Sequence, residues 1–431
     1  MEKTYVDEIL DEKFVGSSVS VSGWVYRKRE MKDKIFLVLR DSTNIVQCII
    51  RKDKVPEETW EKAHKLQIEG SLKVIGKLKK DERAPTGYEI EVERIEVFDF
   101  GDIFPLKGDE KPDAILSWRH LWIRNRKFAA ITKIRHSLTL GMIDYFVKSG
   151  WYYVFPPVIT PTAGEDTTEL FEIKYFNEKA YLSQTAQLYL EAMIFSLEKV
   201  FSLTPSFRAE MSRTKRHLHE YWHLEGEAAW MKNEDMMDFV EALVKAGLKK
   251  VVDERIEELK LIGRDPEQVK EWIKKPFKRI KYSKAIELLK EKGIKIEYGE
   301  DLGADEEREL TLMFDVPIFV TNYPREIKAF YMKEVGDGTV ANFDLLAPEG
   351  YGEIVGGSER ETDYELLIKK MKEFKLKPEN YKWYLDLRKY GSVPHSGFGL
   401  GVDRTVRWIA KVDHVRDTLP FPRLRGGWLE I

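Results

Sequence analysis

The sequence predicts an α+β protein with two parts, a small N-terminal β-barrel and a larger domain whose mostly antiparallel sheet is flanked by helices. Short β-branched or alternating segments fill the first hundred residues, and a stretch rich in glycine, proline and charge follows them. Long amphipathic helices then mix with strands without a strict β–α–β alternation. We therefore expect a barrel domain at 1–100, a linker or hinge at 101–125 and a second domain at 126–431.

Composition narrows the class of protein. The chain has 431 residues, and its 71 basic and 74 acidic side chains leave a net charge of −3, so any contact with nucleic acid must depend on local basic patches. No run of about 18 apolar residues exists, which excludes a transmembrane helix, and the N-terminus lacks the apolar core of a signal peptide. The single cysteine, Cys48, excludes an intramolecular disulfide. We expect a cytoplasmic protein.

The barrel is predicted from five short segments separated by turn signals. They are Val19–Tyr26, Ile35–Arg40, Ile45–Ile50, Ser71–Ile75 and Glu89–Phe98. Pro56–Gln67 has a helical pattern and lies where five-stranded barrels of the OB type insert a helix.

The second domain begins with its clearest helix, Lys127–Lys148, in which apolar residues recur on one face. Two further helices are predicted at Ala186–Phe201 and Asp235–Leu261. The strand-like runs around them are Tyr152–Phe155, Trp222–Trp230, Pro317–Thr321 and Phe398–Leu400.

A basic cluster marks the first candidate site. The stretch FRAEMSRTKRHLHEYWHLE, residues 207–225, is bounded by apolar runs, so we expect a loop that joins two buried strands. Guanidinium groups on such a loop would suit a polyphosphate, although a surface hairpin with ion pairs is an alternative. The three histidines of this stretch lack the spacing of a usual metal site.

Two glycine-rich stretches supply further candidates. In GSVPHSGFGLGVDRTVRW, residues 391–408, the glycines allow a tightly packed strand-to-helix junction under a ligand, and Arg404 follows on the first helical turn. The alternative is that these glycines serve only the close packing of a strand end against a helix. In FDLLAPEGYGEIVGGSERE, residues 343–361, Asp344 and Glu353 form a reasonable pair for a hard cation bound to phosphates. Arg360 would read a carboxylate or an amide. Ordinary surface acids are the alternative for this segment.

Taken in order, GWYYVFPP at 150–157, the block around Arg208 and the block from Gly397 to Arg404 resemble the three signature motifs of class II aminoacyl-tRNA synthetases. With the barrel, nearly the whole chain resembles the aspartyl, asparaginyl and lysyl subgroup. It is most similar to the archaeal asparaginyl branch, because Ala186 and Leu190 stand where aspartyl enzymes typically have proline and lysine. Without that lysine, an aspartate side chain would be left uncompensated.

The resemblance implies a ligase that activates asparagine with ATP and transfers it to the terminal adenosine of tRNA. Catalysis would consist of positioning and charge neutralisation, with Arg208 and Arg404 as catalytic residues. Arg208 would bridge the α-phosphate and the substrate carboxylate. The residues implied for ATP are Arg208, Glu210, Arg216, His217, Leu218, Tyr221, Glu353 and Arg404.

The resemblance also implies sites for Mg²⁺ and for the amino acid. Asp344 and Glu353 would hold Mg²⁺. Arg360 would donate to the side-chain carbonyl oxygen of asparagine, and Glu225 would accept from its NH₂ group. The other residues implied for the amino acid are Glu165, Thr185, Gln187, Arg208 and Ser358. The segment Lys127–Pro157 would form a homodimer interface.

The barrel would bind the tRNA anticodon. Phe36 would stack on a base and Gln47 would read one, although Phe36 taken alone is better explained as a barrel core residue. The predicted loop Arg27–Lys34 would add RNA contacts through Arg27, Lys28 and Arg29.

Two residues depart from the family pattern. Glu359 stands where glutamine is expected, and it would either pair with the neighbouring Arg360 and weaken amide binding or point away. Asp403 stands where glutamate is more usual.

Three alternative functions remain: a paralogue that makes free asparagine from aspartate and ammonia, an aspartyl enzyme that charges both tRNAs, and a catalytically silent RNA-binding protein.

Overall fold

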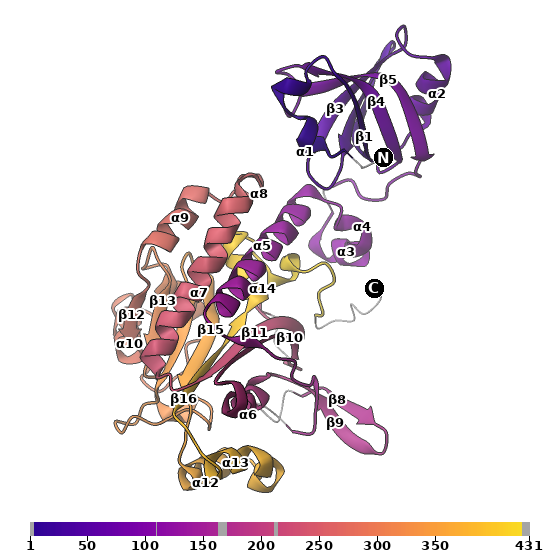
Figure 1. Cartoon of the computed structure of the whole chain (residues 1–431). Helices are drawn as coiled ribbons and strands as arrows, with labels where there is room; N and C mark the ends of the chain where they lie inside the picture. The colour runs from indigo at the N-terminus through magenta and orange to yellow at the C-terminus, as the bar shows by residue number, and fades with distance from the viewer. Residues whose placement is uncertain (1–3, 109, 163–169, 211–213, 425–431) are drawn as a thin grey trace. The chain divides into compact units, whose positions relative to one another are not determined.

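The computed structural model describes residues 4–108, 110–162, 170–210 and 214–424. The chain divides into two compact units, the first ending at Pro112 and the second beginning at Asp113. Figure 1 labels the helices and strands. In the part of the chain that is described, no helix is both long and apolar enough to cross a membrane. The exact domain boundaries, including the linker at 101–125, stay a prediction.

The first unit is a closed five-stranded barrel with the strand order β1-β2-β3-β5-β4, as the sequence predicts. Its strands are β1 (Ser18–Glu30), β2 (Lys34–Arg40), β3 (Ile45–Arg51), β4 (Ser71–Lys80) and β5 (Tyr88–Asp99). The predicted helix is α2 (Glu57–Lys65), and a short helix α1 (Val6–Ile9) precedes the barrel. The predicted loop at 27–34 is wrong in extent, because β1 and β2 remain paired up to Glu30 and Ile35 and leave a turn of only 31–33.

The second unit contains a mixed sheet with the strand order β12-β13-β14-β15-β16-β11-β10-β6. Only the two outermost pairs of this sheet, β12–β13 and β10–β6, are parallel among the described residues. The strands are β6 (Tyr152–Tyr153), β10 (Lys199–Phe207), β11 (Glu220–Ala229), β12 (Lys278–Lys281), β13 (Ile318–Thr321), β14 (Asn342–Ala347), β15 (Gly352–Glu359) and β16 (His395–Gly401). A small sheet of β7 (Ile159–Thr160), β9 (Glu178–Leu182) and β8 (Glu172–Tyr175) lies beside it.

Two long helices pack against this sheet, α5 (Arg126–Lys148) and α7 (Asn233–Glu254) (Figure 1). Asn125 caps α5 by accepting a hydrogen bond from the Lys127 N–H at 2.8 Å. The helices touch at two glycines, because a Cβ added to Gly141 would lie 3.0 Å from the Cα of Gly247. A larger residue at either position would push the two helices apart.

The other helices are shorter and surround the sheet. They are α3 (Pro112–Ser117), α4 (Arg119–Trp122), α6 (Gln187–Leu197), α8 (Ile256–Leu261), α9 (Pro266–Lys274), α10 (Tyr282–Glu291), α11 (Ala304–Thr311), α12 (Tyr364–Glu373), α13 (Lys382–Lys389) and α14 (Val402–Ile409). The helix predicted at 186–201 was wrong at its C-terminal end, because Glu198 has a φ of 62° that ends α6 and lets β10 begin at Lys199. The helix predicted at 235–261 is broken at Arg255 into α7 and α8.

An aromatic cluster forms the centre of the core between α5 and the sheet. Phe146 is fully buried, stacks on Phe201 with ring centroids 4.2 Å apart, and meets Trp151 edge-on at 5.1 Å. A Cβ at Gly226 would lie 3.1–3.2 Å from Trp151 and Phe146, so β11 lies directly under the rings. This packing fixes the strand that carries part of the candidate site.

We expect Phe146→Ala to lower the free energy of unfolding by about 3–5 kcal/mol, because it leaves a cavity among buried aromatic rings. Urea unfolding followed by fluorescence would measure the loss. The control is Tyr390→Ala, where 78% of the side chain is exposed, and it should change stability by less than about 0.5 kcal/mol. A similar effect for both variants would contradict this description of the core.

Candidate active site

The basic stretch begins where β10 ends and runs into β11, so it connects two buried strands, as the sequence predicts. Strands β10 and β11 pair antiparallel out to Phe207 and Glu220, and Arg208 extends the pairing by donating its N–H to the His219 carbonyl at 3.0 Å. The loop therefore leaves the sheet at Arg208 and returns at His219. Arg208 is held at the edge of the sheet by backbone geometry.

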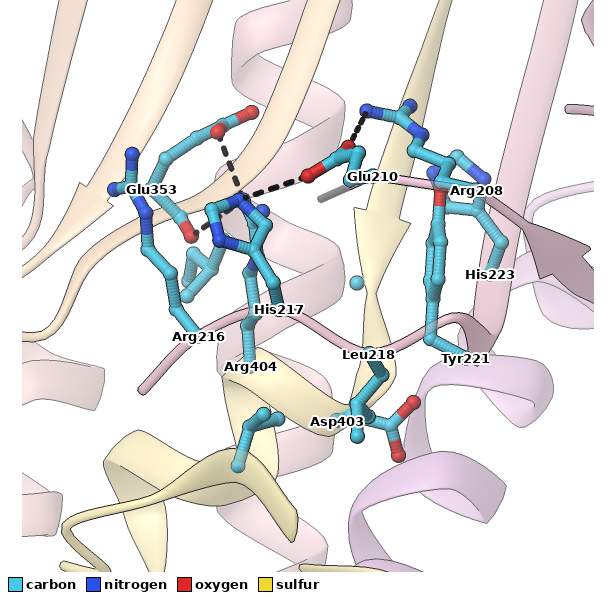
Figure 2. A pocket seen from close by; sticks show the side chains of 14 residues that line it. Arg208, Glu210, Arg216, His217, Leu218, Tyr221, His223, Glu353, Asp403 and Arg404 are labelled. Carbon is cyan, nitrogen blue, oxygen red and sulfur yellow. Dashed lines mark hydrogen bonds and ion pairs between the residues drawn. The ribbon is translucent and has the colours of Figure 1, made fainter. Parts of the chain in front are cut away.

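The eight residues that the sequence implies for ATP all line one pocket, shown in Figure 2. They are Arg208, Glu210, Arg216, His217, Leu218, Tyr221, Glu353 and Arg404. The sheet explains this convergence, because β11 lies between β10 and β16, and β16 lies between β11 and β15. Residues from three distant parts of the chain thereby face one another.

Ion pairs and one carboxylate–histidine contact orient the polar groups of this pocket (Figure 2). Glu210 lies 3.8 Å from the Arg208 guanidinium and 3.3 Å from Nε2 of His217, and Arg404 donates to Glu353 at 2.8 Å. The Arg208 guanidinium lies over the ring of Tyr221, with its central carbon 5.7 Å from the centroid of that ring. Three guanidinium groups around one pocket suit a polyphosphate.

His217 offers a neutral ring to this pocket. Burial and the nearby positive charges of Arg404, Arg216 and Arg208 lower its pKa to about 4. At neutral pH the ring therefore carries no charge, so it would contribute a hydrogen bond to a phosphate rather than a positive charge.

Arg216 is held by Glu307, a residue that sequence analysis did not identify. Glu307 lies on α11, forms an ion pair with Arg216 and accepts the Glu353 backbone N–H at 2.7 Å. Gly352 makes room for it, since a Cβ there would lie 2.4 Å from Oε2 of Glu307. The Nε of Arg216 is buried without a hydrogen-bond partner among the described residues, and an anion would supply one.

Asp344 and Glu353 lie on adjacent strands and face the same side of the hairpin. A Cβ added to Gly356 would lie 3.6 Å from Oδ1 of Asp344 and 3.4 Å from Oε1 of Glu353, so both carboxylates reach over this glycine. Lys328 donates to Asp344 at 2.6 Å. Two carboxylates beside a phosphate pocket form the oxygen donor set that Mg²⁺ prefers, so these residues fit the implied ion.

The electrostatics of these two acids differ. Burial raises the pKa of Asp344 despite the attraction of Lys328. Burial also acts to raise the pKa of Glu353, but the positive charges of Arg404, Lys328 and Arg216 outweigh it and lower that pKa to about 2. Glu353 is therefore ionised at neutral pH.

Arg208 follows the end of β10, and the other implied amino-acid residues that the structure describes lie on α6, β11 and β15 or at their ends. Glu225 accepts hydrogen bonds from the Thr185 hydroxyl and, at 2.8 Å, from the Ala186 N–H. Burial raises the pKa of Glu225 to about 6, although these hydrogen bonds oppose the shift. Gln187 is buried and donates to Glu191 at 3.0 Å.

Arg360 is buried and fixed by two residues. Its Nε and one terminal nitrogen donate to the two carboxylate oxygens of Glu227 at 3.0 and 2.9 Å, and its other terminal nitrogen donates to Ser358 at 2.9 Å. These bonds use three of the five N–H groups of the guanidinium. The other two can donate to a ligand.

Glu359 does not pair with Arg360. It points away and forms an ion pair with Lys333, so of the two possibilities for this residue the structure supports the second. Successive side chains of β15 alternate between faces, which separates Glu359 from the pocket side.

Asp403 is buried, accepts the Trp222 N–H at 2.8 Å and pairs with Arg135. Glu165 lies outside the described residues.

The residues implied for the anticodon all line one groove on the barrel. They are Arg27, Lys28, Arg29, Phe36 and Gln47. Gln47 donates to Glu89 at 2.6 Å. Lys28 bonds the carbonyls of His64 and Leu66 at 2.6 and 2.9 Å, so its ammonium group is already bound to the barrel.

Sequence analysis missed four residues that hold the site, Glu227, Glu307, Lys328 and Glu191. Glu227 could have been found, since it lies two residues after Glu225 and strand neighbours at that spacing share a face. Glu191 could also have been found, since it lies four residues after Gln187 on the same predicted helix. Glu307 and Lys328 come from segments without a local signal.

Comparisons with known proteins agree with this geometry. Residues 111–425 match the family described as tRNA synthetases class II (D, K and N), and residues 19–98 match the OB-fold nucleic acid binding domain. The chain therefore belongs to the class II aminoacyl-tRNA synthetases of this group.

Within this group, the chain is similar to asparagine–tRNA ligases over almost its whole length. The chain is 51% identical to the asparagine–tRNA ligase of Pyrococcus furiosus and 48% identical to that of Thermoplasma acidophilum, over 97–98% of this chain and 98% of each relative. It superposes with a TM-score of 0.94 on asparaginyl-tRNA synthetase from Pyrococcus horikoshii complexed with asparaginyl-adenylate, at 50% identity over 99% of both chains. The Entamoeba histolytica enzyme in complex with asparaginyl-adenylate matches with a TM-score of 0.86, at 34% identity over 95% of both chains.

Glu307 makes the stability of the chain depend on pH. Burial, together with the charge of Glu353, raises its pKa from an ordinary value of 4.5 to about 7 despite the Arg216 charge. The folded chain thus keeps a proton that the unfolded chain releases, and this contribution to stability is complete below pH 4.5 and lost as the pH rises through about 7. We expect the Glu307 contribution to the free energy of unfolding to fall over this window, while the lowered pKa of His217 acts in the opposite direction. Glu307→Gln should therefore make the measured profile fall less, or rise more, than the wild-type profile.

Urea unfolding at a series of pH values would measure this effect. Glu225 acts in the same direction, so Glu307→Gln should remove only part of the fall. Glu309→Gln is the control on the same helix, because Glu309 pairs with Lys292 at the surface and its pKa is lowered instead. An unchanged pH profile in Glu307→Gln would show that this carboxyl is not held as described.

Proposed function

We propose that this chain is an asparagine–tRNA ligase that joins asparagine to the 3′-terminal adenosine of asparagine tRNA through an asparaginyl-adenylate. One observation carries the proposal above the others: all eight residues implied for ATP line one pocket, and the residues implied for the amino acid lie on the same sheet. The match to relatives of this activity over almost the whole chain supports the same conclusion.

In the first step, a carboxylate oxygen of asparagine forms a bond to the α-phosphorus of ATP while the bond to the bridging oxygen of pyrophosphate breaks. The nucleophile is already an anion, so no general base is required. Arg208 at the start of the loop would bind both the α-phosphate and the substrate carboxylate. Arg216 and His217, whose ring is neutral, would bind the terminal phosphates. The adenine would lie against Tyr221.

Asp344 and Glu353 would hold Mg²⁺, which supplies positive charge to the phosphate oxygens. Lys328 already pairs with Asp344 and keeps this carboxylate oriented. Arg404 does the same for Glu353. The arrangement lets two acids remain beside each other in a buried site.

The amide side chain of asparagine would be read by Arg360 and Glu225. Arg360 has two N–H groups left after its bonds to Glu227 and Ser358, and one of them would donate to the amide oxygen. Glu225 would accept from the amide NH₂, because a carboxylate oxygen that already accepts one hydrogen bond can accept another. Thr185, Gln187 and Ser358 position these groups, and Glu165 would complete the site.

In the second step, a ribose hydroxyl of the terminal adenosine would attack the adenylate carbonyl and release AMP. The barrel would bind the anticodon with Phe36 as a stacking platform and Gln47 and the neighbouring basic residues as polar contacts. Residues 1–100 would thus be the anticodon-binding domain and 126–431 the catalytic domain.

The enzyme would be a homodimer that works in the cytoplasm. Large apolar side chains are exposed on and after α5, with Phe155 82%, Val147 59% and Tyr152 57% exposed. Such a patch is typical of an interface, and Lys127–Pro157 would form it with the same segment of a second copy.

ATP–pyrophosphate exchange with asparagine and with aspartate tests the proposed function. We expect exchange with asparagine, little with aspartate, and then charging of asparagine tRNA alone. Arg208→Ala should lower the exchange rate by about 10²–10³-fold, since it removes a positive charge from the reacting phosphate. The control is Arg94→Ala, a partly exposed barrel arginine paired with Glu96, which should leave exchange unchanged.

Two outcomes would contradict the proposal. Exchange with aspartate, followed by ammonia-dependent release of asparagine or by charging of aspartate tRNA, would point to one of the alternative enzymes. Full exchange in Arg208→Ala would show that the loop does not carry the role assigned to it.

A further inference from the structure

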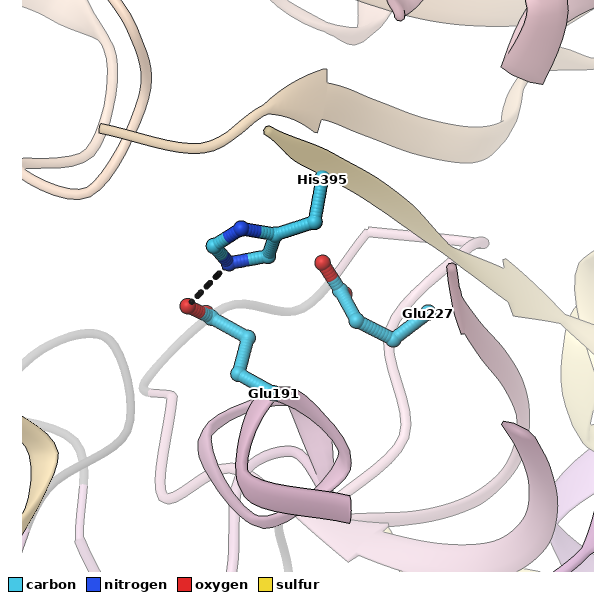
Figure 3. Close-up of side chains that lie close together, drawn as sticks. All are labelled: Glu191, Glu227 and His395. Atoms are coloured by element: carbon cyan, nitrogen blue, oxygen red, sulfur yellow. Dashed lines mark hydrogen bonds and ion pairs between the residues drawn. The ribbon is translucent and has the colours of Figure 1, made fainter. Parts of the chain in front are cut away.

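A cluster of buried polar groups lies next to the amino-acid residues (Figure 3). Glu191, Glu227 and His395 bring one ligand atom each to within 4.8 Å of one another, a spacing that would suit a metal ion. Both oxygens of Glu227 are bonded by Arg360, however, and Glu191 is bonded by Arg388 at 2.7 Å. Guanidinium groups therefore supply the positive charge that a cation would bring.

Glu191 accepts more hydrogen bonds than its neighbours in this cluster. Besides Arg388, the donors are the Tyr384 hydroxyl at 2.8 and 2.9 Å, the His395 Nε2 at 3.0 Å and the Gln187 amide at 3.0 Å. Glu191 has no exposed surface. Burial acts to raise its pKa, but the charge of Arg388 and the hydrogen bond and charge of His395 outweigh it and lower the pKa well below its ordinary value.

The Glu191 charge acts on the residue that would read the substrate amide. Glu191 and Glu227 both lie close to the His395 ring (Figure 3). Glu227 in turn holds Arg360. The charges of Glu191 and Glu227 both raise the pKa of Arg360. The three carboxylates of Glu191, Glu227 and Glu225 thus offset the positive charges of Arg360, Arg388 and His395. Glu225 lies on the same strand as Glu227.

Helix α6 contributes only negative charge to this region. Leu190 is buried in an apolar cluster with Val154, Ala186 and Ile194, so it brings no polar group toward the pocket. The next residue, Glu191, points into the charged cluster instead. A substrate carboxylate entering this region would meet no unopposed positive charge.

We infer that Glu191 is a specificity-determining residue, whose buried negative charge lets the pocket accept the neutral side chain of asparagine and reject the carboxylate of aspartate. The inference rests on the proposed function and goes beyond it, because Glu191 is not placed in contact with the substrate. Its negative charge acts electrostatically on the positively charged guanidinium group of Arg360. Gln187, one of the residues implied to hold the substrate, donates a hydrogen bond to Glu191 and so connects the Glu191 charge to the amino-acid site.

The test is the ratio of kcat/KM for aspartate to kcat/KM for asparagine in pyrophosphate exchange by the full-length enzyme. Glu191→Gln keeps the shape of the side chain and removes its charge, so this ratio should rise by about tenfold, as expected for a unit charge acting over several ångströms. A residue that only supported the fold would lower both activities together and leave the ratio unchanged.

Three further variants separate charge from structure. Arg388→Met removes the opposing positive charge and should lower the ratio, and the double variant Glu191→Gln with Arg388→Met should return it toward the wild-type value. Glu241→Gln removes a partly buried carboxylate that pairs with Lys245 at 2.7 Å on α7, outside the site, and should leave the ratio unchanged. Thermal unfolding of each variant identifies any that does not fold. Arg388→Met still decides the question if Glu191→Gln is unfolded.

The outcomes distinguish this inference from the proposed function. A wild-type enzyme that prefers aspartate would overturn both. A wild-type enzyme that selects asparagine, with an unchanged ratio in folded Glu191→Gln or in Arg388→Met, would overturn the role of Glu191 and leave the proposed function intact.

Discussion

Pairs of opposite charges, some buried and some partly exposed, hold the candidate active site in place. Arg360 is bound by Glu227, Arg216 by Glu307, Arg404 by Glu353 and Asp344 by Lys328. An unpaired buried charge costs several kcal/mol, so each partner keeps the other in one orientation. The positions of several groups proposed to bind ATP and the amino acid therefore depend on partners, namely Glu227, Glu307 and Lys328, that are not proposed to touch either ligand. Groups held in this way suit a reaction driven by positioning.

The sheet brings these charges together. The strand order β15-β16-β11-β10 places the basic loop, the glycine-rich hairpin and the start of α14 beside one another, although more than 180 residues separate Arg208 from Arg404. Glycines allow the close contacts, and a Cβ at Gly397 would lie 1.8 Å from Glu227 and 2.6 Å from Arg360. The same sheet carries the buried cluster around Glu191, so amino-acid choice and adenylate chemistry would depend on one framework.

Much of the fold and of the site could be predicted from the sequence, because short segments carry their own signals. Alternation and turn residues predicted the barrel, and the resemblance of three separate motifs to one family implied a set of side chains that the structure brings to one pocket. The partners could not be predicted in this way. Glu307 reaches Arg216 from a helix 91 residues away, and Lys328 has no local pattern that points to Asp344. Local signals also failed at Glu198, where one residue with positive φ ends a helix that the apolar pattern would continue.

The central claim is that the site is complementary to asparaginyl-adenylate. Calorimetry with non-hydrolysable sulfamoyl analogues of asparaginyl- and aspartyl-adenylate, which share every contact except those of the side-chain amide, tests this claim most directly. The account predicts that the asparaginyl analogue binds at least about 100-fold more tightly, since the aspartyl analogue places an uncompensated carboxylate beside Glu225 and Glu227. Equal affinities, or tighter binding of the aspartyl analogue, would contradict it.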